Sequence, residues 1–130
     1  MPNDRPLVAI VNKDATFVQL LDTLLRNEGY DTLLVEAGDI AHPTLKQQRP
    51  HVILLDIDID APAASWRVVD LLLLDPDTAQ KPLIICSVAN QTLAERADKL
   101  VAAGCTIVEK PFLIDELLTH IRALVKRRET

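Results

Sequence analysis

The sequence predicts an α/β fold of the (βα)5 type, in which a parallel sheet is covered by helices on both faces. Five short segments rich in Val, Ile and Leu alternate with segments whose apolar residues recur at helical spacing. Each apolar segment has the continuous hydrophobicity of a strand that is buried on both faces. Strict alternation of such strands with helices is typical of a parallel sheet with crossover helices.

The five predicted strands share a short length and a composition that suits the interior of a sheet. In chain order they comprise residues 7–11, 32–35, 52–56, 83–88 and 106–108. Pro50 precedes the third strand and Pro82 introduces the fourth. Because Pro lacks a backbone donor, it belongs before a central strand and not inside it.

The predicted helices follow from apolar spacing and from signals at their ends. They cover residues 15–28, 39–48, 66–74, 92–103 and 114–124. Asp14 is placed to cap the first helix, and Gly29 ends it. The second helix is weak, because Pro43 removes a backbone donor inside it. Residues 92–95 (Thr-Leu-Ala-Glu) form a capping box that opens the fourth helix, and Gly104 ends that helix.

Length, composition and charge describe one globular unit. The 130 residues, of which 48% are hydrophobic and 25% charged, predict a single domain over residues 1–130, with a core at about 6–125 and no output domain. The net charge of −5 disfavours nucleic acid as a partner. The basic residues 126–128 are better explained as a solvated helix end. No membrane span and no signal peptide is recognised, so we expect a cytoplasmic protein without a membrane partner.

Polar side chains are expected to meet at the carboxyl ends of the strands, where open parallel sheets bind their ligands. The third strand ends on Asp56, and the ends of the fourth and fifth carry Ser87 and Lys110. This set suits a phosphoryl group attached to the carboxylate: the lysine offsets anionic oxygens, the serine donates a hydrogen bond and the carboxylate is the nucleophile. Alternatively, Asp56 is a solvated strand end and Lys110 belongs to a surface ion pair.

Motifs along almost the full chain resemble the receiver domain of bacterial response regulators. The matching segments are residues 11–14, 28–30, 53–56, 75–76, 78–79, 87, 103–104 and 109–112. The resemblance implies a flavodoxin-like three-layer sandwich with strand order 2-1-3-4-5. It also implies that Asp56 is the phosphoacceptor and that Ser87 contacts the phosphoryl group. Lys110 matches the family's lysine, whose bond to Pro111 is expected to be cis.

The sequence departs from the family where two acidic residues hold Mg²⁺, because Asn12 and Lys13 stand in their place. Magnesium requires oxygen ligands. A lysine ammonium about 4 Å away opposes each positive charge by about 4 kcal/mol at an effective dielectric of about 20. We therefore expect weak or absent Mg²⁺ binding, with Asp56, Asp58 and Asn12 as the remaining candidate ligands. Lys13 either pairs with Asp56 as a built-in cation or faces solvent.

Two further departures concern how a signal would leave the site. Ile107 stands where the family usually has an aromatic switch residue, and Asp60 stands where it usually has proline. We therefore expect that phosphorylation is not transmitted by the family's usual rotamer switch.

The leading hypothesis is a stand-alone receiver in phosphorelay signalling, which is not an enzyme. A histidine kinase or phosphotransfer protein would phosphorylate Asp56, and the added charge would change a surface read by a downstream protein partner. The alternative is a pseudo-receiver, a protein-interaction module that works without phosphorylation, as Asn12 and Lys13 suggest. A homodimer remains open. A flavodoxin-like enzyme is disfavoured, because the chain has three glycines and no Gly-rich phosphate loop.

Overall fold

The structure is a computed structural model that describes the backbone of residues 5–129 and the side chains of residues 5–127. One five-stranded parallel sheet runs through it in the order β2-β1-β3-β4-β5. The strands are β1 (Leu7–Val11), β2 (Asp31–Val35), β3 (Val52–Asp56), β4 (Leu83–Val88) and β5 (Thr106–Lys110). The predicted fold class and strand order are confirmed.

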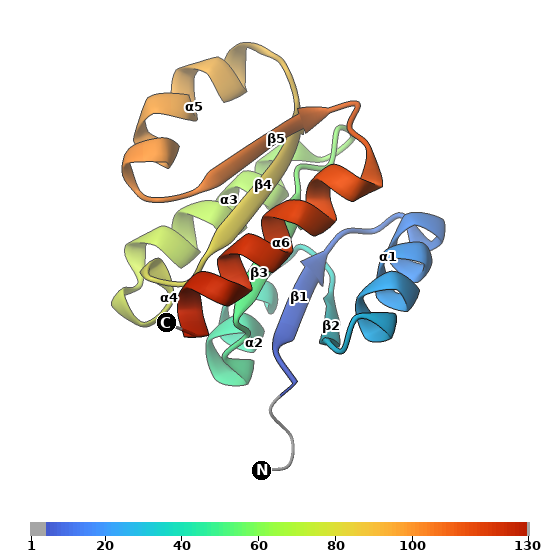
Figure 1. Ribbon diagram of the computed structural model, residues 1–130. Coiled ribbons are helices and arrows are strands. Elements are labelled where there is room, and N and C mark those ends of the chain that lie inside the picture. The colour runs from blue at the N-terminus through green and yellow to red at the C-terminus, as the bar shows by residue number, and fades with distance from the viewer. Residues whose placement is uncertain (1–4, 130) are drawn as a thin grey trace.

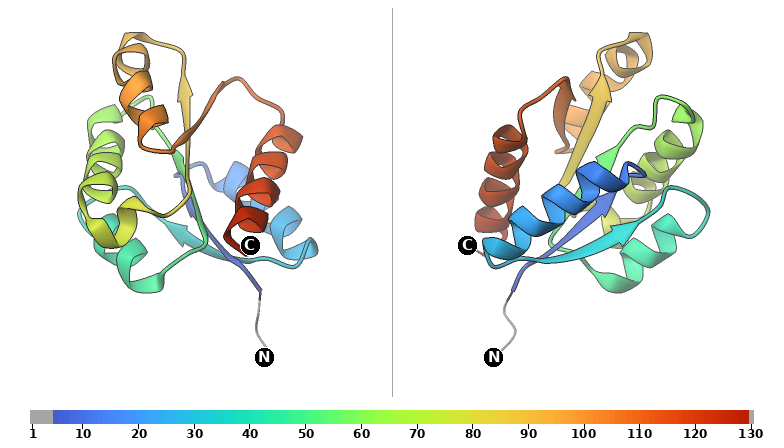
Figure 2. Two further views of the ribbon diagram at one scale, coloured as in Figure 1. Left: turned by 60° about the vertical axis from the view of Figure 1, so that its left-hand side comes forward. Right: turned by 90° about the vertical axis from the view of Figure 1, so that its right-hand side faces the viewer.

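Helices cover both faces of the sheet, as Figures 1 and 2 show. They are α1 (Ala15–Asn27), α2 (Ala41–Gln48), α3 (Pro62–Leu74), α4 (Pro76–Ala79), α5 (Gln91–Ala102) and α6 (Ile114–Glu129). Residues of α1 and α6 pack on one face, and residues of α2, α3 and α5 pack on the other. None of the helices in the described residues has the length and apolar character needed to cross a membrane.

The side chains of β3 are buried in two hydrophobic cores, one on each face of the sheet. Ile53 and Leu55 belong to the core under α2, α3 and α5, whereas Val52 and Leu54 belong to the core under α1 and α6. Each of these four side chains is at most 3% exposed. Burial of such a side chain contributes about 1.5–3 kcal/mol. The strand is therefore fixed from both faces, and its last residue, Asp56, is delivered to the carboxyl edge of the sheet.

The predicted ends of α1 are confirmed. The side chain of Asp14 accepts hydrogen bonds from the backbone N–H groups of Thr16 (3.1 Å) and Phe17 (3.2 Å), which otherwise lack partners inside the helix. Gly29, just after the helix, has φ +93°, and Gly104, just after α5, has φ +90°. These left-handed conformations favour glycine, which explains why both helices end there.

The start of α5 differs from the predicted capping box. Asn90 is the N-cap, and its side-chain oxygen accepts the N–H of Leu93 at 2.9 Å. The helix therefore begins at Gln91, and the prediction that Thr92 caps it was wrong. Asparagine and threonine are both favoured as N-cap residues, so Asn90 and Thr92 are both suitable residues for the start of this helix.

Prolines account for the other differences. The segment before Trp66 was predicted as a loop, but α3 begins at Pro62, whose fixed φ suits the first helical position. A second Pro at such a position starts the four-residue α4, which was not predicted. Pro43 lies in the first turn of α2, where the backbone N–H has no helical partner to lose, so the helix tolerates it.

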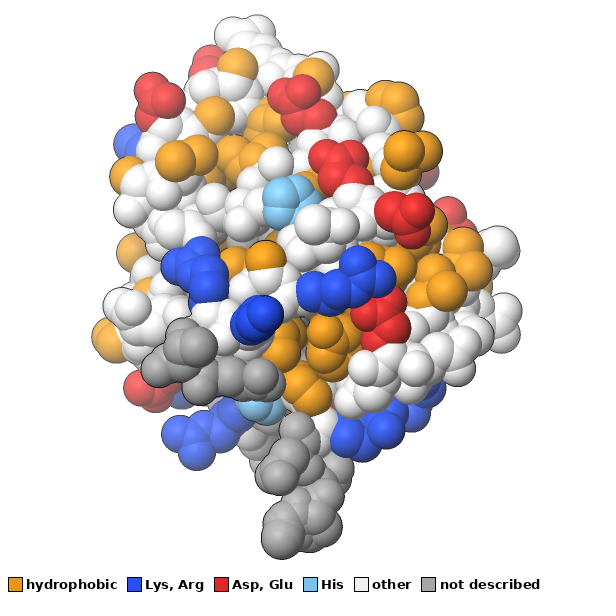
Figure 3. All heavy atoms as spheres, viewed as in Figure 1, with side chains coloured by type: hydrophobic (Ala, Val, Ile, Leu, Met, Phe, Trp, Pro, Cys, Tyr) orange, Lys and Arg blue, Asp and Glu red, His pale blue; other side chains and the backbone are white. Residues whose placement is uncertain are grey.

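Charges are separated along α6. Its first turn carries Asp115 and Glu116, and its last described side chains include Lys126 and Arg127, while the side chain of Arg128 lies outside the described residues. Figure 3, which shows this face, has most of its acidic side chains in the upper half and most of its basic ones in the middle and lower parts. Acidic residues at a helix start and basic residues at its end are favourable with the helix dipole.

Candidate functional site

The predicted site residues come together at the carboxyl edge of the sheet. Asp56 ends β3, Lys110 ends β5, and Ser87 is the next-to-last residue of β4. In the strand pairing, Asp56 is opposite Cys86, and Val88 is opposite Lys110, so Lys110 lies two residues further along the sheet than Asp56, and Ser87 lies between these two levels. A cavity of ≈ 240 Å³ opens there and is lined by Val11, Asn12, Lys13, Glu36, Ala37, Asp56, Asp58 and Ser65.

Asp56 and Lys110 form the closest ion pair of the site. The Lys110 Nζ lies 2.5 Å from Asp56 Oδ1 and also donates to the carbonyl of Ile57 at 3.4 Å. The Asp56 side chain is 17% exposed, and its burial raises the pKa of the carboxyl above the ordinary value, an effect that the Lys110 ammonium opposes. Among the described residues, Asp56 Oδ2 receives no hydrogen bond. The lysine thus holds one carboxylate oxygen and leaves the other available as a nucleophile.

Ser87 is placed beside this pair but does not contact it. Its side chain is buried, and its hydroxyl donates a hydrogen bond to the carbonyl of Val88 at 2.9 Å. In the described residues no hydrogen bond joins Ser87 to Asp56. A hydroxyl can turn about its side-chain bond, so Ser87 reaches a group on Asp56 only after it leaves the Val88 carbonyl.

The oxygens predicted as further metal ligands are already engaged within the protein. The amide oxygen of Asn12 accepts the N–H of Asp14 at 2.8 Å. Asp58 Oδ1 accepts the N–H of Asp60 at 2.9 Å, and Asp58 Oδ2 lies 3.0 Å from the Lys13 Nζ. A magnesium ion at Asp58 Oδ2 would have to displace the Lys13 ammonium, and at the other two oxygens it would compete with the backbone N–H groups that they accept.

This donor set does not fit a divalent cation. Magnesium requires several hard oxygen ligands in nearly octahedral geometry. The cavity is lined by the carboxylates of Asp56, Asp58 and Glu36, but it also holds the Lys13 ammonium, which pairs with Asp58. Within residues 5–129, no group of three or more His, Cys, Asp or Glu side chains is arranged to hold a metal ion.

Of the two alternatives for Lys13, the pairing with Asp56 was wrong, whereas its side chain is largely exposed to solvent, at 61%. Its ammonium pairs with Asp58 at 3.0 Å and with Asp60 at 3.5 Å, and no ion pair joins it to Asp56 among the described side chains. The pKa of Asp58 is lowered, first by the backbone N–H of Asp60 and next by the hydrogen bond from Lys13. The pKa of Lys13 is raised by its bond to Asp58. The two carboxylates follow Asp56 by two and four residues, and they draw Lys13 away from it.

Ser65 is a site residue that was not predicted. It is fully buried in the first turn of α3, and its Oγ accepts the N–H of Asp58 at 3.0 Å. This bond fixes the backbone that follows Asp56. Pro62 could have indicated this role in the sequence. A helix that begins at Pro62 has Ser65 in its first turn, where Ser65 lines the cavity.

The segment after Lys110 has the predicted geometry. The peptide bond between Lys110 and Pro111 is cis. The next residue, Phe112, packs edge-on against Phe17 of α1, with 6.0 Å between ring centroids. Ile107, at the position expected to carry an aromatic switch residue, is partly buried against the core under α2, α3 and α5.

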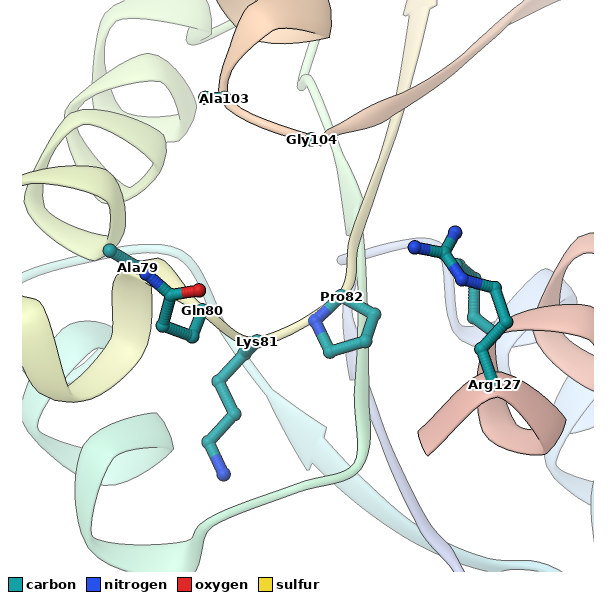
Figure 4. Close-up of a pocket in the computed structure, with 8 residues that line it drawn as sticks. Ala79, Gln80, Lys81, Pro82, Ala103, Gly104 and Arg127 are labelled. Carbon is teal, nitrogen blue, oxygen red and sulfur yellow. The ribbon is translucent and has the colours of Figure 1, made fainter. Parts of the chain in front are cut away.

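A second hollow, of ≈ 280 Å³, lies at the opposite edge of the sheet, where β4 begins (Figure 4). Its lining residues are Ala79, Gln80, Lys81, Pro82, Ala103, Gly104, Leu124 and Arg127. Lys81 extends away from the backbone of Ala103 and Gly104 in this view. None of the lining residues is a carboxylate, so this hollow has no counterpart of Asp56.

Known proteins share this sequence pattern and this fold. The family model described as response regulator receiver domain matches residues 8–122. The transcriptional regulatory protein PrrA of Mycobacterium bovis is 28% identical over 123 residues, which are 95% of this chain and 51% of PrrA. The chain spans about half the length of the curated relatives it matches.

Solved structures show the same fold. The receiver domain of a signal transduction histidine kinase from Syntrophus aciditrophicus has a TM-score of 0.78 at 23% identity, covering 93% of this chain and 90% of its own. The receiver domain of the sensor histidine kinase PA1611 from Pseudomonas aeruginosa, which has a magnesium ion coordinated in its active-site cleft, has a TM-score of 0.72 at 20% identity, covering 94% of this chain and 98% of its own. With the family model matched over most of its length, the chain belongs to the response regulator receiver domain family.

Proposed function

We propose that this receiver domain takes a phosphoryl group on Asp56 from a histidine kinase or phosphotransfer protein. The observation that carries the proposal is the 2.5 Å contact between Lys110 Nζ and Asp56 Oδ1, which leaves Oδ2 without a hydrogen bond beside the cavity. We propose that this transfer takes place in the cytoplasm.

The chemistry follows from these positions. Asp56 Oδ2 forms a bond to phosphorus while the bond from phosphorus to the imidazole nitrogen of the donor's phosphohistidine breaks, and the imidazole leaves with the electron pair. Lys110 offsets the charge of the phosphoryl oxygens. Ser87 gives up its bond to the Val88 carbonyl and donates to the phosphoryl group instead. Mg²⁺ takes little or no part, because the oxygens of Asn12 and Asp58 are engaged by protein groups. The acyl phosphate carries about −1.5 to −2 charges where the carboxylate carried one, and a downstream protein partner reads the change.

A pseudo-receiver is the second candidate, and one observation favours it. The ion pair between Lys13 and Asp58 puts a permanent cation among the predicted metal ligands. A site in which a lysine permanently pairs with a candidate metal ligand suits a protein-interaction module that keeps one conformation. In that case Asp56 and Lys110 form a purely structural ion pair.

Incubation with acetyl phosphate, followed by intact mass measurement, tests the proposal. We expect the wild type to gain the mass of one phosphoryl group and the Asp56→Asn variant to gain none. Asp75→Asn is the matched control, because Asp75 also pairs with a lysine but lies away from the cavity. Absence of an adduct on the wild type, together with an adduct on an Asn12→Asp/Lys13→Asp variant, would favour the pseudo-receiver.

A further inference from the structure

We propose that the Lys13 ammonium is the resident cation of the Asp56 site and takes the place of a divalent metal. The site would then be charge-compensated without Mg²⁺. The inference deepens the proposed function and rests on it for the role of Asp56, but its first measurement needs no phosphorylation.

The first support is position. Lys13 and Asp56 line the same cavity, and Asp58, which holds the ammonium, lines it too. The Lys13 Nζ lies 3.0 Å from Asp58 Oδ2 and 3.5 Å from Asp60 Oδ2. An ammonium held between two carboxylates at the mouth of the site already occupies the negative potential that would attract a metal ion.

The second support is the fixed geometry around this cation. Ser65, fully buried, accepts the N–H of Asp58, and Asp58 Oδ1 in turn accepts the N–H of Asp60. On the other side, the amide oxygen of Asn12 accepts the N–H of Asp14, which fixes the segment that carries Lys13. Both loops are thus arranged by hydrogen bonds that leave Asp58 Oδ2 directed at the ammonium. No rearrangement is needed for Lys13 to stay.

The third support is electrostatic. A divalent ion bound beside Asp56 would share the cavity with the Lys13 ammonium, and repulsion between the two positive charges would lower its affinity. Asp14 does not compensate, because its side chain caps α1 through the N–H groups of Thr16 and Phe17. Among the described residues, no three acidic side chains are arranged to hold a metal ion.

The chain contains a second cluster of the same design. Lys46 lies 3.0 Å from Asp75 and 3.5 Å from Asp77, and the N–H of Asp77 donates to Asp75 Oδ1 at 3.0 Å. None of these three residues lines the cavity at Asp56, so the cluster is structural. The difference between the two clusters is the acceptor carboxylate beside Lys13. Lys46 is therefore a matched control for Lys13.

The cation has a defined part in group transfer. With acetyl phosphate as donor, Asp56 Oδ2 forms a bond to phosphorus while the bond from phosphorus to the acetyl oxygen breaks. Acetate leaves with the electron pair, an acyl phosphate remains on Asp56, and no proton is exchanged. The phosphoryl group brings negative charge toward Lys13, whose exposed and flexible side chain turns from Asp58 to meet it.

The first test is a Mg²⁺ titration followed by amide NMR spectra of the full chain. We expect no saturable shift at residues 12, 13, 56 and 58 of the wild type or of Lys46→Met. The Asn12→Asp/Lys13→Asp variant is expected to show saturable binding at millimolar Mg²⁺. Saturable binding to the wild type, with shifts at Asp56 and Asp58, would overturn the inference.

The second test measures acetyl phosphate reactivity by intact mass, with Mg²⁺ or with a chelator. We expect equal wild-type rates in both, a loss of about tenfold for Lys13→Met, recovery with Lys13→Arg, and no change for Lys46→Met. A wild-type reaction that requires Mg²⁺ contradicts the inference and leaves the proposed function standing. If no adduct forms under any condition, the proposed function fails. The Mg²⁺ titration still tests the inference in that case, because a wild type that binds no Mg²⁺ supports Lys13 as the resident cation.

Discussion

Lys13 and Asp58 form an ion pair, with 3.0 Å between the ammonium and a carboxylate oxygen, across the loops that follow β1 and β3. The pair lies next to Asp56, whose own partner is Lys110. Two lysines therefore serve two aspartates at the same edge of the sheet. Lys110 contacts one carboxylate oxygen of Asp56 and leaves the other without a hydrogen bond among the described residues. Lys13 pairs with Asp58 and, as we propose, takes the place of a metal ion.

Loss of the Lys110 ammonium is expected to destabilise the fold. Lys110→Met leaves the mostly buried Asp56 carboxylate without its charged partner, which costs about 1–3 kcal/mol of unfolding free energy. Urea unfolding at neutral pH measures the change. In the Lys110→Met/Asp56→Asn double variant the uncompensated charge is gone, so part of the stability returns. A double variant that is less stable than the sum of the single changes contradicts this reading.

Asp14 is expected to act as a helix cap and not as a metal ligand. Asp14→Ala removes the acceptor for the N–H groups of Thr16 and Phe17, and costs about 1 kcal/mol of stability. Asp14→Ser keeps a capping oxygen but loses the carboxylate. Thermal unfolding should therefore place Asp14→Ser near the wild type, with or without Mg²⁺. A stability of Asp14→Ser that depends on Mg²⁺ would argue for a ligand role.

The cluster around Asp75 predicts an acid-sensitive contribution to stability. The backbone N–H of Asp77, the Lys46 ammonium and the His42 ring lower the pKa of Asp75 to about 2. A carboxyl whose pKa is lower in the folded state stabilises the fold above its unfolded-state pKa, and this stability is lost as the pH falls toward 2.

Asp75→Asn is the variant that isolates this effect. It should unfold more readily than the wild type at neutral pH, and the difference should shrink as the solution is acidified toward the folded-state pKa. Urea unfolding at a series of pH values measures it. A difference that does not depend on pH would show that the charge of Asp75 contributes nothing.

The core under α1 and α6 is expected to be sensitive to loss of volume. Leu54→Ala removes a side chain that is 3% exposed and leaves a cavity, at a cost of about 2–5 kcal/mol. Leu74→Ala is the control, because Leu74 is 79% exposed and its loss should change stability by no more than about 0.5 kcal/mol. Denaturant midpoints compare the two. Equal costs would mean that β3 is not the centre of the core.

The strands of this protein can be predicted from its sequence because they are buried on both faces of the sheet. Their uniform apolar runs fix the positions of Asp56 and Lys110 at strand ends, and the fold then brings these two residues together. Helix starts were less certain where two capping residues compete, as Asn90 and Thr92 do before α5. The short α4 has too few residues to show a helical period.

The partner of Lys13 could not be read from the sequence for a physical reason. A lysine side chain is long and flexible, and three aspartates lie within five residues of one another after β3. Its choice depends on the turn at Asp58, where hydrogen bonds to Ser65 and Asp60 fix the backbone. The bond to Asp60 is a local turn and the bond to Ser65 spans seven residues, and hydrophobic periodicity predicts neither.

The most direct test of the account is to locate the phosphoryl group after reaction with acetyl phosphate. Borohydride reduces an acyl phosphate on aspartate to an alcohol, and peptide mass mapping then identifies the modified residue. The account predicts reduction at Asp56 alone, among the four aspartates that surround the site (Asp14, Asp56, Asp58 and Asp60). Reduction at any of the other three, or at none while an intact-mass adduct persists, would contradict it.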